Sequence, residues 1–123
     1  MDVQDLVSGY EIDFLIRLGL ALVFGFAIGV EREARGKPAG ISTHSFVIGG
    51  AALFTFVSLQ VDPNSPARIA AQVVSGVGFL GAGMILRSDE GVVTNPTTAA
   101  AVWFAAAIGM ALGFGWYLIA AAA

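Results

Sequence analysis

The chain has 123 residues, of which 57% are hydrophobic and 12% are charged, with a net charge of −3 and no cysteine. An ordinary soluble domain carries about 25% charged residues, so this sequence has too few polar side chains to cover a soluble surface. The lack of a Lys and Arg cluster excludes a nucleic-acid partner, and the lack of cysteine excludes a disulfide scaffold. These features indicate a protein whose apolar side chains face the lipid bilayer.

Four stretches of the chain lack charged side chains, and short segments that hold most of the charge separate them. A helix needs about 20 residues to span the hydrocarbon core of a bilayer. The pattern predicts an all-α fold, a polytopic transmembrane helix bundle of four to five helices that forms one domain over residues 1–123. We expect helices over about 12–30, 43–61, 67–86, 97–111 and 114–123, with the last one incomplete.

The first helix reaches a spanning length if it includes Arg17. Asp13 lies four residues earlier on the same helical face, where the two side chains can pair. The long arginine stem can also extend toward the membrane interface. We therefore expect an interfacial ion pair rather than a functional arginine at bilayer depth.

The last apolar segment is too long for one span, because its residues from Thr97 onward would rise about 40 Å as a continuous helix. Three glycines, at positions 109, 113 and 115, lie near its middle. Glycine weakens a helix, so we expect a break there. The pair Asn95-Pro96 is typical of a helix start and predicts where this segment begins.

Residues 75–83 contain the G-x-G-x-x-G pattern of dinucleotide-binding proteins. That fingerprint must follow a strand and precede an acidic residue by about 20 positions, whereas Asp89 and Glu90 come too early. We therefore expect no nucleotide cofactor here.

Small residues let helices approach one another in lipid, where close packing drives their association. This indicates that segment 67–86 is central to the bundle, and its glycines either pack against neighbours or leave room for a substrate. The spacing does not decide whether such contacts form within one chain or between copies. The glycines that we expect to pack are Gly25, Gly29, Gly76, Gly78, Gly81, Gly83, Gly109 and Gly113.

Gln72 is a strongly polar side chain inside the third segment, with Arg68 one turn before it and Ser75 almost one turn after it. A buried amide in lipid needs hydrogen-bond partners. These three polar side chains therefore form a stripe that fits either an interhelical hydrogen bond or the polar lining of an ion or substrate path.

The loop at positions 31–40 mixes charges of both signs, and Glu31 and Arg35 are spaced to pair on a helical extension. It serves either to set the topology or as a gate, a lipid head-group contact or a partner surface. Lys and Arg are concentrated in this loop and in the third loop, which contains Arg87. By the positive-inside rule, both loops are expected in the cytoplasm and the amino terminus in the periplasm.

Catalytic and metal-binding constellations are missing from the pattern. His44 is the single histidine, so one chain cannot assemble a Ser-His-Asp triad, and we expect this side chain at the membrane interface. Asp62 falls on the membrane side opposite the other loop carboxylates, so these cannot form one cage for a hard cation. We expect neither a metal site nor a cofactor nor an enzyme.

Four blocks of sequence resemble the MgtC/SapB family of membrane proteins, and together they cover nearly the whole chain. The blocks are residues 25–35, with the run GFAIGVERE; residues 39–44, AGISTH; residues 65–83, from SPARIAAQ to GVGFLGAG; and residues 97–103, TTAA followed by Trp103. Two departures stand out. The family usually has Arg where this chain has Ser42, and many members continue through a complete fifth helix into a soluble cytoplasmic domain.

The resemblance implies a bacterial inner-membrane protein linked to adaptation to low magnesium and, in some pathogens, to virulence. By match to the family blocks, the functional candidates are Glu31, Arg32, Arg35, Thr43, Arg68, Gln72, Arg87, Thr97 and Thr98. The leading hypothesis is a regulatory protein in the bilayer that binds another membrane complex or itself as a homo-oligomer. The alternative is a transporter or channel for magnesium or another ion.

Overall fold

The computed structural model describes residues 4, 8–87 and 93–123. Within these residues the chain forms five helices and one pair of short strands. The elements are α1 (Glu11–Ala34), α2 (Ile41–Val61), α3 (Ala67–Met84), β1 (Leu86–Arg87), β2 (Val93–Thr94), α4 (Pro96–Gly113) and α5 (Tyr117–Ala122). Four of the helices are long and apolar enough to cross a membrane. The predicted all-α, polytopic fold is confirmed.

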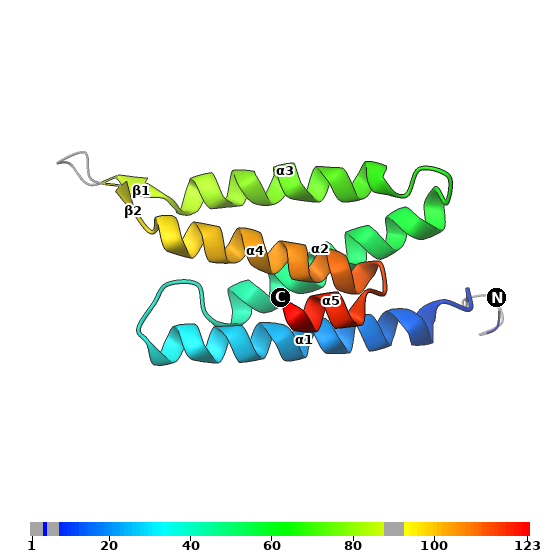
Figure 1. Ribbon diagram of the computed structural model, residues 1–123, viewed down its shortest axis with the longest axis horizontal. Helices are drawn as coiled ribbons and strands as arrows, with labels where there is room; N and C mark the ends of the chain where they lie inside the picture. The colour runs from blue at the N-terminus through cyan, green and yellow to red at the C-terminus, as the bar shows by residue number, and fades with distance from the viewer. Residues whose placement is uncertain (1–3, 5–7, 88–92) are drawn as a thin grey trace.

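The helices α2 and α4 form the centre of the bundle, with α1 on one side and α3 on the other (Figure 1). Within their apolar spans, 56% of α4 and 44% of α2 is buried, compared with 22% of α3 and 17% of α1. The expectation that segment 67–86 is central is therefore wrong. Small residues show that a helix can pack closely, but α2 and α4 have apolar or small residues on more of their circumference and fill the centre.

The core consists of small side chains with a few larger ones between them. One cluster joins α1, α2, α4 and α5 and contains Ala21, Ile48, Ala52, Ala105, Ile108, Leu112 and Ala120. A second cluster joins α2, α3 and α4 and contains Ala51, Val73, Val77, Val102 and Ala106. Alanine at so many contacts brings the helix backbones close together, which is how helices associate in lipid.

Four of the glycines predicted to pack lie at helix crossings. A Cβ atom added to Gly25 would come within 2.6 Å of the Cα of Ser45, and one added to Gly113 within 2.7 Å of the carbonyl oxygen of Ala52. Gly29 and Gly109 meet backbone atoms of α2 at comparably close range. Any side chain at these positions would push α2 away from α1 or α4.

The glycines of α3 have different surroundings. A Cβ atom on Gly81 would make an ordinary contact, 3.7 Å from the Cβ of Ala99, whereas Gly76, Gly78 and Gly83 have no atom within 4 Å of that position. These three glycines lie on the outer surface of a single chain. They do not pack within the bundle.

The segment after residue 96 breaks at the last of its three central glycines. Gly115 has a φ of 81°, and the N–H groups of Gly115 and Trp116 donate to the carbonyl oxygens of Leu112 and Ala111. This is a Schellman motif, which favours glycine because the backbone at this position adopts the left-handed conformation. Gly109 and Gly113 remain inside α4, so the helix ends beyond the expected position 111.

The bundle has two ends of different composition. The loop at 35–40 and the β1–β2 pair lie at one end, which we call the basic end, and the start of α1 and the α2–α3 loop lie at the other (Figure 1). In β1–β2, Leu86 pairs with Thr94 and Arg87 with Val93 in an antiparallel register. This strand pair was not predicted, because two-residue strands carry no periodic signal.

Candidate functional site

The predicted functional residues divide between the two ends of the bundle. Arg68 and Gln72 lie in the first two turns of α3, toward the end opposite the basic end, and both are exposed. Arg87 belongs to β1 at the basic end, and its side chain falls outside the part that the structure describes. The remaining candidates lie at the basic end: Glu31, Arg32, Arg35, Thr43, Thr97 and Thr98.

Three of these candidates surround a cavity of about 250 Å³ at the basic end, which we call the polar pocket. The end of α1, the following loop and the start of α4 form its walls. The lining residues are Arg32, Lys37, Pro38, Asn95, Pro96, Thr97 and Thr98. Lys37 and Asn95 are not among the predicted site residues, because nothing in the sequence shows that the first loop meets the start of α4.

Arg32 joins the two halves of the polar pocket. Its Nη2 donates to the Oγ1 of Thr98 at 2.5 Å and to the carbonyl oxygen of Pro38 at 3.0 Å. Its Nε is buried and has no acceptor among the described residues. A hydrogen-bonded guanidinium is fixed in place by these contacts, and it still has donors that no described residue uses.

The start of α4 supplies the opposite wall. Asn95 occupies the N-cap position in a left-handed conformation, with φ of 62°, and makes no side-chain capping bond. Its amide instead points toward the carbonyl oxygen of Met84, at 3.5 Å. The first N–H groups of a helix have no partner inside the helix, so those of Thr97 and Thr98 lack the acceptor that an N-cap asparagine ordinarily gives them.

Glu31, Arg35 and Thr43 lie near the polar pocket but do not line it. Glu31 and Arg35 form an exposed ion pair at 3.3 Å, as their spacing predicts. Thr43 is half-buried in the first turn of α2. Glu33 accepts a hydrogen bond from the backbone N–H of Ile41 at 3.1 Å, which fixes the loop against the start of α2.

His44 is fully buried in α2, so it faces neither lipid nor solvent, and its position at the membrane interface stays a prediction. Its Nδ1 lies 3.0 Å from the carbonyl oxygen of Gly40. A carbonyl oxygen can only accept, which assigns the proton to Nδ1 in the neutral ring. Its Nε2 has no partner among the described residues. The side chain lies one turn inside α2, where α1 and α4 pack on that helix, and this burial is not visible in a single sequence.

Arg17 pairs with Asp13 at 2.7 Å at the opposite end of the bundle, which confirms the predicted pairing. The arginine side chain does not extend away from the bundle, because only 13% of it is exposed. It packs beneath the end of α4 and donates to the carbonyl oxygen of Gly113. Arg17 therefore has a structural role between helices.

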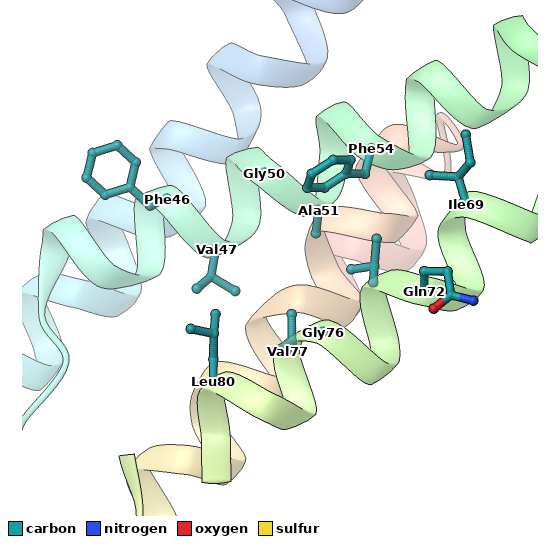
Figure 2. A pocket seen from close by; sticks show the side chains of 11 residues that line it. Phe46, Val47, Gly50, Ala51, Phe54, Ile69, Gln72, Gly76, Val77 and Leu80 are labelled. Atoms are coloured by element: carbon teal, nitrogen blue, oxygen red, sulfur yellow. The ribbon is translucent and has the colours of Figure 1, made fainter. Parts of the chain in front are cut away.

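A second cavity, of about 450 Å³, lies between α2 and α3, and we call it the α2–α3 groove. Figure 2 shows its walls, with Phe46 and Phe54 on α2 and Gln72 and Leu80 on α3. Nearly all of the lining is apolar, and Gln72 is the side chain with an amide. Across the described residues, no three His, Asp or Glu side chains gather in a way that could hold a metal ion.

Comparison with known proteins places this architecture in a family. A sequence model of the MgtC family matches residues 18–123. The chain is 50% identical over 114 residues to "Putative magnesium transporter YhiD" of Escherichia coli (strain K12), an alignment that covers 85% of the chain and 53% of YhiD. It is 46% identical over 111 residues to Protein MgtC of Salmonella typhimurium (strain LT2), covering 89% of the chain and 47% of MgtC.

A third relative, Protein SapB of Bacillus subtilis (strain 168), is 39% identical over 122 residues, which cover 91% of the chain and 53% of SapB. The chain thus spans about half the length of the curated relatives that it matches. No solved structure matches it. The family match and the four apolar helices agree on a multi-pass membrane protein. The chain belongs to the MgtC family.

Proposed function

We propose that this chain is the membrane domain of a regulatory protein of the bacterial inner membrane, which binds another membrane protein or a second copy of itself during adaptation to low magnesium. The observation that carries the proposal is the outward face of α3, where Gln72, Gly76 and Gly83 are exposed in a single chain. Gly76 follows Gln72 by four residues and precedes Gly83 by seven, so the three lie on one flank of the helix.

Without a partner, this flank of α3 would face the hydrocarbon of a lipid bilayer. Hydrocarbon gives the Gln72 amide no hydrogen-bond partner, and an unpaired buried amide is unfavourable. A partner helix can supply one. Gly76 and Gly83 have no atom within 4 Å of an added Cβ, so a second helix can approach the backbone of α3 closely.

The α2–α3 groove adjoins the same flank, because Gln72 and Gly76 line it. Its volume of about 450 Å³ is large enough for several side chains of a partner helix. Apolar side chains packed there would bury the exposed rings of Phe46 and Phe54. This supports a partner that binds across α2 and α3 rather than along α1.

Ion transport is the second candidate, and the name of the YhiD relative proposes it for magnesium. Gln72 and Ser75 are exposed on α3 rather than enclosed by the bundle. A polar path along them would therefore run between copies of the chain. Transport and partner binding make different predictions for a purified, reconstituted protein.

Cysteine cross-linking tests contact with a second copy directly, because the natural chain has no cysteine and each copy of a variant carries one thiol. Gly76→Cys places a thiol on the proposed flank, and Gly78→Cys places one on the other side of the same helix, where an added Cβ also meets no atom. We expect oxidation in native membranes to give a cross-linked species at position 76 and little at position 78. Equal cross-linking at both positions, or none at either, would contradict this contact between copies.

Magnesium flux into proteoliposomes separates the two functions. The partner-binding proposal expects no flux above that of empty liposomes. Flux that the purified protein supports, and that Gln72→Leu abolishes, would overturn it in favour of transport. If partner binding holds, the same variant should weaken cross-linking through Gly76→Cys, because leucine removes the amide that would form the interhelical hydrogen bond.

A further inference from the structure

The polar pocket is lined by donors of hydrogen bonds and positive charge. Arg32 and Lys37 both contribute to its surface, and none of the described lining residues is acidic. Two cations around one small cavity repel each other, and nearby low-dielectric material strengthens that repulsion. An anion in the cavity would relieve it.

The start of α4 points additional donors into the same place. Because Asn95 makes no capping bond, the N–H groups in the first turn of α4 have no side-chain acceptor among the described residues. These groups also carry the partial positive charge of the helix dipole. Thr97 adds a hydroxyl to the lining, and this combination is the one by which helix starts bind phosphate and other oxyanions.

Arg32 provides an independent observation that points the same way. Its hydrogen bonds to Thr98 and Pro38 both use Nη2, and its Nε is buried without a described acceptor. Both hydrogens of Nη2 are therefore used within the chain and Nε is covered, so Nη1 is the donor that a phosphate oxygen can meet, in a charge-assisted bond. The intramolecular bonds hold this charged group in place before any ligand arrives, which lowers the ordering cost of binding.

From these contacts we propose that the polar pocket binds a phosphate group, held by Arg32, Lys37 and the first turn of α4. This site is separate from the α3 flank and does not depend on the proposed function. The end of α1 and the start of α4 both lie at the basic end of the bundle (Figure 1). Because both line the pocket, it lies near the head-group level if the two helices cross the bilayer. The phosphate can therefore come from an anionic phospholipid or from free phosphate in solution.

The test compares two variants that remove the same charge from the same end of the protein. Lys37→Ala removes a lining cation from an exposed loop residue, and Arg35→Ala removes an exposed cation that does not line the pocket. The proteins are purified in nanodiscs of phosphatidylcholine. Binding is measured for inorganic phosphate by calorimetry, and for phosphatidylglycerol by native mass spectrometry after titration into the discs.

We expect Lys37→Ala to weaken binding of one of these probes by about tenfold, as the loss of a hydrogen bond to a charged group does, and Arg35→Ala to change it less than twofold. Thr97→Val should weaken the same probe without altering the melting temperature of the unliganded protein, which separates ligand contact from folding. Saturable phosphate binding identifies a free anion as the ligand, and phosphatidylglycerol binding alone identifies a lipid head group. Equal losses in Lys37→Ala and Arg35→Ala, or no binding of either probe, would overturn the proposal.

Discussion

Arg17 on α1 donates a hydrogen bond through Nη1 to the carbonyl oxygen of Gly113 in the last turn of α4. The same guanidinium binds both carboxylate oxygens of Asp13, at 3.0 and 2.7 Å, and lies 4.9 Å from the centre of the Phe56 ring. The last carbonyl groups of a helix lack partners and carry partial negative charge. One arginine therefore connects α1, α2 and α4 at the end opposite the basic end.

Replacing Arg17 by leucine should destabilise the folded protein by about 2 kcal/mol, because it removes a charged hydrogen bond and a cation–aromatic contact from a mostly buried side chain. Asp13 is 47% exposed, so water can hydrate its carboxylate in the variant and the loss stays moderate. The free energy of unfolding in mixed micelles, followed by circular dichroism, measures the effect.

The exposed pair of Glu31 and Arg35 supplies the control for that measurement. Its side chains are 64% and 69% exposed, so Arg35→Leu should change the free energy of unfolding by less than about 0.5 kcal/mol. If both leucine variants lost the same stability, the contacts that Arg17 makes with α4 and Phe56 would be energetically unimportant.

Gly109 and Gly78 should respond in opposite ways to alanine. A Cβ on Gly109 would come within 2.8 Å of the Cβ of Ala51 and still closer to the carbonyl oxygen of Ile48. Overpacking of this kind costs about 1–3 kcal/mol. At Gly78 an added Cβ meets no atom, and alanine favours a helix over glycine, so Gly78→Ala should be neutral or stabilising by up to about 1 kcal/mol.

Melting temperatures of the two alanine variants in the same detergent give the comparison. A loss of stability in Gly109→Ala with none in Gly78→Ala is the expected pattern. Destabilisation by Gly78→Ala in the monomeric protein would mean that α3 packs more tightly within one chain than the structure shows.

The sequence predicted the fold well, because long apolar segments between charged loops leave few alternatives in a membrane. The small residues of α1 and α4 also predicted close helix packing correctly, because glycines at helical spacing let two backbones approach each other. The sequence could not rank the helices by burial. Gly76 and Gly109 look alike in sequence, yet one is on the outer surface and the other meets Ile48.

The polar pocket was predictable only in part. Arg32, Thr97 and Thr98 were identified through their family blocks. The contact that joins α1 with α4, however, is the one between Arg32 and Thr98, which lie 66 positions apart along the chain. Lys37 and Asn95 complete the lining. Local patterns gave each of them another role, one as a loop charge that sets topology and the other as a helix cap, because tertiary contacts are not encoded in local spacing.

Gly115 controls the turn between α4 and α5. Its φ of 81° is unfavourable for any residue with a Cβ, so Gly115→Ala should lower stability by about 1–2 kcal/mol. Gly19 lies in α1 with no atom near an added Cβ, and Gly19→Ala should not lower stability. A Gly115→Ala protein as stable as the parent would show that the chain leaves α4 by a different turn.

Orientation in the membrane can be tested with single cysteines that leave every Lys and Arg in place. Ala34→Cys marks the basic end and Asn64→Cys marks the opposite end, and both residues are exposed. Because Lys and Arg concentrate in cytoplasmic loops, a membrane-impermeant maleimide added to intact spheroplasts should label position 64 and reach position 34 only after lysis. The cysteine-free parent gives the background. Labelling of position 34 in intact spheroplasts, with position 64 protected, would reverse the assignment and place the polar pocket on the periplasmic face.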